Sequence, residues 1–199
     1  MAINKQPVAK KCRTYGISPT VMGYSKKVTK RNPGGNRRRK VSEYGTQLQE
    51  KQKVKYVYGV LEKQFRKYFE NASKMEGGTT GENMLRLLEM RLDNVVYRLG
   101  MAKTRRMARQ VVVHGHIRVN GKKVDIPSYQ VKVGDVITLR QRSAEMEMFK
   151  VLREGTTNVI PKWLTFDAPN RKGTVNDVPA RDDIDLQVQE NMIVEFYSR

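Results

Sequence analysis

The side chains best suited to chemistry in this sequence are arginines and lysines, and the chemistry they suit is phosphate binding. The 199 residues include 39 Lys and Arg but only 20 Asp and Glu, which gives a formal charge of +19. Such a charge repels itself in a compact fold unless an anionic partner, commonly nucleic acid or an acidic membrane surface, neutralises it. The candidate phosphate-binding residues are Arg37, Arg38, Arg39, Lys40, Lys51, Lys53, Lys55, Lys63, Arg66, Arg105, Arg106, Arg109, Arg118, Lys122 and Lys123.

The positive charge is concentrated in two stretches. Residues 1–40 contain 12 basic residues and no acidic one, and residues 84–140 contain 12 basic and 4 acidic residues. Proline and glycine interrupt the first stretch, which has few periodic apolar residues. We therefore expect residues 1–42 to form an extended or disordered basic tail that orders on a polyanion, the alternative being a merely solvated tail.

A helix that begins after Thr104, a good N-cap residue, should place its apolar residues on one side. Arg105 and Arg109 then lie beside that stripe, and Arg106 lies on the far side. No carboxylate occurs in residues 94–124, so nothing nearby in the sequence is available to pair with these arginines. This pattern favours phosphate contact over the alternative of a solvated helix face.

Residues 117–126 have the pattern of a β-hairpin. Apolar and polar residues alternate on both sides of Asn120-Gly121, a dipeptide that tolerates the positive φ angles of a tight turn. A third strand is expected from Val136 to Leu139. Two helices followed by a small antiparallel sheet make a compact module that suits the recognition of RNA by shape.

Residues 42–72 carry a helical pattern. Ser42 is a plausible N-cap, and apolar residues at positions 54–72 recur at helical spacing. Gly59 lies inside this pattern, so two helices that meet there are as compatible with it as one long helix. The aromatic members of the stripe could stack on bases, but at this spacing core packing is favoured.

A second helical stretch follows two glycines. Thr79 and Glu82 have the spacing of a capping box. Apolar residues then continue at intervals of three and four as far as Leu99, and Gly100 is a natural helix terminator.

The last part of the chain is acidic, with 4 basic and 7 acidic residues in 164–199. Residues 145–154 are expected to form a short helix, and residues 161–199 strands and turns. The final apolar stretch, 192–197, should dock on protein rather than contact RNA.

The pattern of potential catalytic groups argues against an enzyme. His114 and His116 lie two residues apart with no third ligand nearby, and the lone Cys12 cannot form an intrachain disulfide or a multi-cysteine zinc cluster. The glycine-rich stretch 77–81 lacks the lysine of a phosphate-binding loop. We therefore expect no enzymatic activity, no cofactor and no metal.

Neither membrane insertion nor export is expected. No apolar run approaches the roughly 18 residues that can span a bilayer, and the first twelve residues lack the apolar core of a secretory signal. The expected location is the cytoplasm.

Two stretches of the sequence resemble known proteins. Met90–Gly100, with Asp93, Asn94 and Arg98, together with His114–Lys122, resembles the S-four RNA-binding domain. Residues 42–66 and the ending Val194–Tyr197 are similar to small-subunit ribosomal protein four of bacteria. The central module alone is shared with RNA-modifying enzymes and other translation factors, so the preceding helical part is what indicates the ribosomal family.

The resemblance implies an α+β fold: a basic extension over 1–42, an α-helical domain over 43–90 that is completed by about 176–199, and a mixed domain over 91–175 with a small antiparallel sheet. It implies a structural constituent of the small ribosomal subunit that binds the five-prime domain of its rRNA and nucleates assembly of the subunit body. It also implies contacts with small-subunit proteins five and three, with mRNA at the entry path, and a role in translational accuracy.

The chain departs from the family in its tail. Some members carry a four-cysteine zinc site there, whereas this chain has only Cys12. A loop that often contains histidine reads Asn32–Asn36 here. A ribosome-associated factor that uses the central module transiently is the rival interpretation, but it would need neither the helical part nor the long tail.

Overall fold

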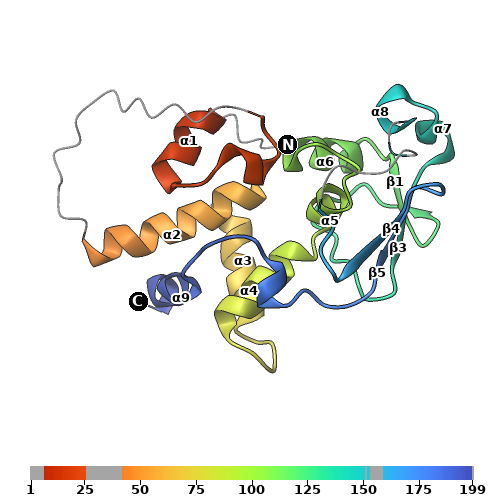
Figure 1. Ribbon diagram of the computed structural model, residues 1–199. Coiled ribbons are helices and arrows are strands. Elements are labelled where there is room, and N and C mark those ends of the chain that lie inside the picture. The colour runs from red at the N-terminus through yellow and green to blue at the C-terminus, as the bar shows by residue number, and fades with distance from the viewer. Residues whose placement is uncertain (1–6, 26–41, 151, 153–158, 199) are drawn as a thin grey trace.

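The structure, a computed structural model, describes residues 7–25, 42–150, 152 and 159–198. Its fold is α+β, as expected from the sequence. Figure 1 shows a helical part at one end and a sheet with short helices at the other. The C-terminal chain returns from the sheet to the helical end, where α9 lies beside α2.

The helical part combines segments from both ends of the chain. Its elements are α1 (Val8–Tyr15), a 3-10 turn η1 (Pro19–Met22), α2 (Glu43–Tyr58), α3 (Glu62–Ala72), α4 (Thr80–Glu89), a 3-10 turn η3 (Arg181–Asp183) and α9 (Glu190–Ser198). The predicted capping residues are confirmed: the Ser42 hydroxyl accepts a hydrogen bond from the Gly45 N–H, and Thr79 and Glu82 form a reciprocal capping box. Gly59 adopts a left-handed conformation that ends α2, so the stripe forms two helices.

The stripe of aromatic and aliphatic residues forms the core of this part, which confirms that interpretation. Phe65 is fully buried and Tyr68 nearly so, against Leu85 and Leu88 of α4. Ile193 of α9 completes the same cluster. The helical core therefore depends on residues more than 120 positions apart in the sequence.

Among the described residues, the second part contains four helices, two of them only four residues long, and a five-stranded antiparallel sheet of order β2-β1-β3-β5-β4. Its elements are α5 (Leu92–Arg98), α6 (Arg105–Val113), β1 (Ile117–Val119), β2 (Lys122–Lys123), β3 (Val136–Leu139), α7 (Gln141–Ala144), α8 (Glu147–Lys150), β4 (Leu164–Asp167) and β5 (Lys172–Val175). The first strand of the predicted hairpin, its turn and the third strand are confirmed, but the second strand is wrong, because β2 lies at Lys122–Lys123 rather than at residues 124–126. Leu92, Val112 and Ile137 lie in its core, which is separate from the helical one.

The single helix expected between Thr79 and Leu99 is wrong, because it divides at Met90 and Arg91. Arg91 has an extended backbone and forms an isolated β-bridge with Gln130. Its guanidinium forms two hydrogen bonds with Asp93, at 3.0 and 2.7 Å, and donates a third to the Tyr68 hydroxyl at 2.6 Å. These buried bonds hold α5 at an angle to α4 that a continuous helix could not provide.

The expectation of an extended or disordered tail is wrong for residues 7–25. Val8, Cys12 and Met22 are buried in a small cluster with Tyr56 of α2. A side chain on Gly23 would meet the Lys103 carbonyl oxygen at 2.0 Å, so only glycine permits this close approach to the loop before α6. Arg37, Arg38, Arg39 and Lys40 lie outside the described residues.

The strands and turns expected after Pro161 account for β4 and β5 but are wrong for the end of the chain. Residues 190–198 form α9, which packs on α2 and α4. Arg181 pairs with Glu190 and donates a hydrogen bond to the Ile184 carbonyl, so the segment that leads to α9 is held in place. In the stretch expected to form one helix over 145–154, α8 occupies four residues and part lies outside the described residues.

A buried carboxylate joins the two parts of the molecule. Glu89, at the end of α4, is 1% exposed. It accepts hydrogen bonds from the Tyr58 hydroxyl at 2.6 Å, from Asn94 Nδ2 at 2.5 Å, and from Arg98 Nη2 at 2.9 Å. Arg98 also donates to Asp185 Oδ1 at 2.7 Å. One ionic cluster thus connects α2, α4, α5 and the returning C-terminal segment.

Arg98 determines the ionisation of Glu89. Burial alone would raise the pKa of this carboxyl, but the charge and hydrogen bonds of Arg98 outweigh it, so the pKa lies below its ordinary value. A carboxyl whose pKa is lower in the folded than in the unfolded state stabilises the fold fully above the ordinary carboxyl range. That contribution is lost as the pH falls through the lowered folded-state value.

We predict that Glu89→Gln lowers the free energy of unfolding at pH 7 by about 3–5 kcal/mol, because it leaves the Arg98 charge buried without its main partner. Urea denaturation from pH 7 to pH 3 should also show a shallower loss of stability on acidification than in the parent chain. Glu147→Gln is the control, since Glu147 is exposed and its ion pair with Lys150 should contribute little. If the free energy of unfolding fell equally steeply between pH 7 and pH 3 in Glu89→Gln and in the parent, the lowered pKa of Glu89 would be contradicted.

Candidate nucleic-acid interface

Helix α6 is held in place by buried contacts that start at its first turn. The Thr104 hydroxyl accepts a hydrogen bond from the Met107 N–H, as predicted. Arg105 Nε donates to Asn94 Oδ1 at 2.9 Å and its Nη1 to the Val21 carbonyl at 3.1 Å. The guanidinium also lies over the Tyr97 ring, 4.4 Å from its centroid. Arg105 thereby connects α6 to α5 and to the N-terminal segment.

The expectation that no residue pairs with the arginines of α6 is wrong, because Arg105 and Arg109 have partners in the fold and Arg106 also interacts with another group. Arg105 is 9% exposed and its partners occupy it, which argues against a direct phosphate contact. Arg109 Nη1 lies 3.8 Å from Asp93 Oδ2, and its side chain is 29% exposed. Asp93 and Asn94 come from α5 and Val21 from the N-terminal segment, and Asp93 lies just before the stretch in which the sequence lacks carboxylates. Arg106 is exposed on the outer face of α6 and remains a predicted phosphate contact.

The hairpin places like charges opposite each other. Arg118 of β1 is the register partner of Lys123 of β2, and both side chains are exposed, as is that of Lys122. Like charges directly opposite on a sheet destabilise it, so an anion that binds between them would relieve the repulsion. Lys123 has a carboxylate 3.4 Å away on Asp125, an exposed pair that neutralises it weakly. This hairpin is the clearest anion-binding surface among the predicted sites.

The turn geometry explains how the hairpin is fixed. Asn120 has a φ of 49° and Gly121 a φ of 77°. The Asn120 side chain donates to Asp135 Oδ1 at 2.8 Å and accepts from the Val136 N–H at 2.9 Å. Asparagine therefore both tolerates the left-handed turn and ties the hairpin to the start of β3.

Two of the predicted cations of α2 and α3 bind the same carboxylate, that of Glu62. Lys51 is buried, contrary to the expectation that it is free to meet phosphate: its Nζ lies 2.8 Å from Glu62 Oε1 and 4.2 Å from the Phe196 ring centroid. Lys55 binds the other oxygen of Glu62 at 2.8 Å. Burial alone would raise the pKa of Glu62, but the hydrogen bonds from these two lysines outweigh it and lower the pKa to about 2.

The remaining predicted cations of this part differ in exposure. Lys53 lies 3.5 Å from Glu50, and only 16% of its side chain is exposed. Lys63 and Arg66 are exposed, and Arg66 pairs with Glu70 one turn away. Lys63 and Arg66 are therefore the better placed of the predicted phosphate contacts on these two helices.

The two histidines occupy structural positions. His114 ends α6, and His116 Nδ1 lies 2.8 Å from the Ser143 hydroxyl. Burial, followed by the charges of His114 and Arg140, lowers the pKa of His116, which favours its neutral form. Within the described residues no group of three His, Cys, Asp or Glu side chains could hold a metal ion. In the same part of the chain no helix is long and apolar enough to cross a bilayer.

The residues that position the interface could not be identified from the sequence. Tyr58, Glu89 and Arg98 interact across separations of 9 and 31 positions, which correspond to no helical or strand period. The helix at Val8–Tyr15 did have a local signal, since Val8, Cys12 and Tyr15 are spaced four and three residues apart.

Comparisons with known proteins cover the whole chain. The family model "Ribosomal protein S4/S9 N-terminal domain" matches residues 4–89, and the model "S4 domain" matches residues 90–137. Proteins named "Small ribosomal subunit protein uS4" from Lachnoclostridium phytofermentans, Lachnospira eligens and Fusobacterium nucleatum are 52%, 50% and 50% identical to it. Each alignment covers 100% of both chains.

We predict that Gly121→Val destabilises the chain by about 1–2 kcal/mol, the cost of a side chain in the left-handed region. A Cβ at this position would meet no atom within 4 Å, so the loss should come from backbone strain alone. Ser128→Val, in a nearby exposed turn with no positive φ, is the control. Equal free energies of unfolding for the two variants, measured in urea, would show that the left-handed backbone at position 121 does not require glycine.

Proposed function

The chain belongs to the bacterial-type ribosomal protein S4 family, and on this premise we propose that it is a non-enzymatic structural constituent of the small ribosomal subunit that binds rRNA directly. Its place of action is then the ribosome in the cytoplasm. The observation that carries the proposal is that the similarity extends over both parts of the chain. The central module alone would fit many RNA-binding proteins, whereas the helical part is specific to the ribosomal family.

The structure supports RNA binding through an arrangement of charge. Exposed Arg106 lies on α6 and exposed Arg118 on β1, and the other faces of these two elements are buried in one core. Cations held on a fixed frame can follow the phosphate spacing of a folded RNA, and counterions released from that RNA favour the complex. Such a surface reads backbone shape, as the deep and narrow major groove of an RNA helix requires.

The finer parts of the proposal rest on the family. We propose that the RNA partner is the five-prime domain of small-subunit rRNA and that binding nucleates assembly of the subunit body. We also propose contacts with small-subunit proteins five and three and with mRNA at the entry path, and a contribution to translational accuracy. Helix α9, packed on α2 and α4, contains two glutamates and no Lys or Arg, which fits a protein-facing role.

Sedimentation distinguishes a structural constituent from a transient factor that uses the same central module. We predict that the chain remains in the small-subunit peak of a sucrose gradient at one copy per particle after a high-salt wash. Quantitative immunoblotting of the fractions measures this stoichiometry. Release at moderate salt would support the transient factor instead.

Log affinity falls as log salt rises. We predict that Arg106→Gln and Lys122→Gln each make this negative slope shallower by roughly 0.7–0.9, the value for one lost phosphate contact. Filter binding to rRNA at several salt concentrations measures this slope. Arg105→Gln should instead reduce the free energy of unfolding, because Arg105 joins α6 to Asn94 and Val21. Lys74→Gln, in the exposed loop after α3, is the control for a general charge effect. Unchanged slopes for both variants would remove these two residues from the interface.

A further inference from the structure

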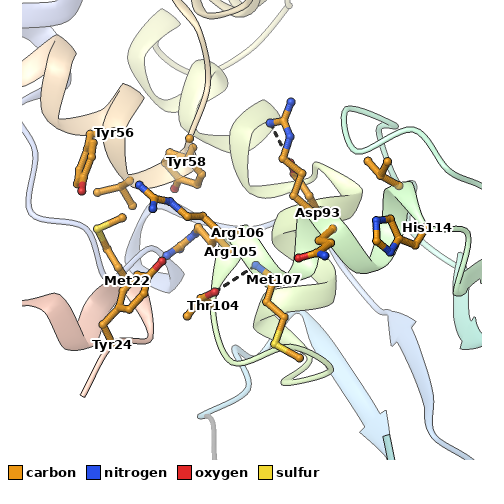
Figure 2. A pocket seen from close by; sticks show the side chains of 15 residues that line it. Met22, Tyr24, Tyr56, Tyr58, Asp93, Thr104, Arg105, Arg106, Met107 and His114 are labelled. Atoms are coloured by element: carbon orange, nitrogen blue, oxygen red, sulfur yellow. Dashed lines mark hydrogen bonds and ion pairs between the residues drawn. The ribbon is translucent and has the colours of Figure 1, made fainter. Parts of the chain in front are cut away.

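A cleft of about 560 Å³ lies between the N-terminal segment, the end of α2 and the outer side of α6. Figure 2 shows Met22, Tyr24 and Tyr56 on one side of Arg105 and Arg106 of α6. Its size falls within the roughly 300–1,000 Å³ of pockets that hold one small ligand. The walls combine apolar and aromatic surface with a few polar groups, the usual composition of a binding pocket.

One wall of the cleft contains a hydroxyl that lacks a partner. Tyr56 is 5% exposed, and its hydroxyl has no hydrogen-bond partner among the described residues. Arg109 Nε, on another wall, is likewise buried without one. Leaving buried polar groups unpaired is unfavourable, and native proteins rarely do so. A ligand that brings acceptor atoms into the cleft would supply both partners.

The electrostatics of the cleft favour an anionic ligand. Arg106 is exposed at its edge, and Figure 2 shows its side chain extending toward Tyr56. Burial raises the pKa of the Tyr56 hydroxyl, with Cys12 adding to the rise and Arg106 opposing it, so Tyr56 is a neutral donor. Asp93 is the only carboxylate among the described residues that line the cleft, and Arg91 already binds both of its oxygens.

We propose that this cleft binds a single unpaired nucleotide of RNA, with its base against Tyr24, Met22 and Tyr56 and its phosphate beside Arg106. The proposal rests on the proposed function and adds to it a site that recognises a base. Unpaired bases stack on aromatic side chains and present acceptor atoms at their edges. The Tyr56 hydroxyl donates to one of these acceptors.

The size and position of the cleft exclude a base-paired segment as its occupant. A pocket of this volume holds a ligand about the size of one nucleotide, whereas a duplex would rest on the exposed cations outside. The cleft lies beside α6, so the neighbouring nucleotides can follow the outer face of that helix, where Arg106 is exposed. Shape recognition on the hairpin and base recognition in the cleft can therefore serve the same RNA.

Tyr56→Phe tests the site, because it removes one oxygen atom that has no partner in the free protein. We expect the free protein to be at least as stable as the parent, and the affinity for transcribed small-subunit rRNA to fall about five-fold, the effect of one hydrogen bond. The salt slope should stay the same, since no charge is removed. Tyr44→Phe, the same change on an exposed ring at the far end of α2, is the matched control.

Base-specific chemical probing of the same complexes provides the second measurement. We expect the parent chain and Tyr44→Phe to alter the reactivity of one unpaired base, and Tyr56→Phe and Arg106→Gln to lose that change while they keep the rest of the footprint. Arg106→Gln keeps the test decisive if Tyr56→Phe folds poorly, because Arg106 is exposed. Wild-type affinity and footprint for Tyr56→Phe, or an Arg106→Gln footprint that keeps the altered base, would overturn the site. Failure of the parent chain to bind rRNA would overturn the proposed function with it.

Discussion

The buried bond between Glu89 and Arg98 is the interaction on which the rest of the structure depends. Two ionised groups are removed from water at the boundary between the helical part and the sheet, and this is tolerable because both Glu89 oxygens accept hydrogen bonds and Arg98 donates from Nε and Nη2. Tyr58 and Asn94 supply two of these partners, and Asp185 supplies a third from the returning C-terminal segment. The requirement that all of them meet at one point fixes α2, α4 and α5 relative to one another.

The basic residues therefore serve two different purposes. Arg91, Arg98, Arg105 and Lys51 are buried and bind carboxylates, carbonyls and aromatic rings inside the protein. Arg106 of α6 and Arg118, Lys122 and Lys123 of the hairpin are exposed and contribute to the surplus positive charge of the surface. The buried basic residues hold the helices and strands together, and these elements in turn position the exposed basic residues. A high positive charge in such a protein is consequently an incomplete measure of its capacity to bind RNA, because part of that charge holds the fold together.

Sequence patterns predicted the elements that have local causes. Capping at Ser42, Thr79 and Thr104, the turn at Asn120-Gly121 and the strands β1 and β3 each depend on residues within a few positions, whereas the second strand of the hairpin was expected two residues later than β2. The break at Arg91 was missed because its cause lies in the side chains of Asp93 and Tyr68 and in a bridge to a distant loop. The burial of Lys51 and Arg105 was missed for the same reason, since their partners come from elements that only the tertiary fold brings close. The family resemblance implied a two-part architecture, but it did not indicate which cations are exposed.

The central claim is that a fixed set of exposed cations recognises one folded RNA rather than negative charge in general. Competition binding tests it most directly, with the purified chain, a labelled five-prime domain of small-subunit rRNA, and unrelated structured RNAs of equal length as competitors. The account predicts that the labelled RNA is retained against an excess of unrelated RNA, and that the preference increases as salt weakens non-specific binding. Equal competition by every RNA of the same length, at low and high salt alike, would contradict it.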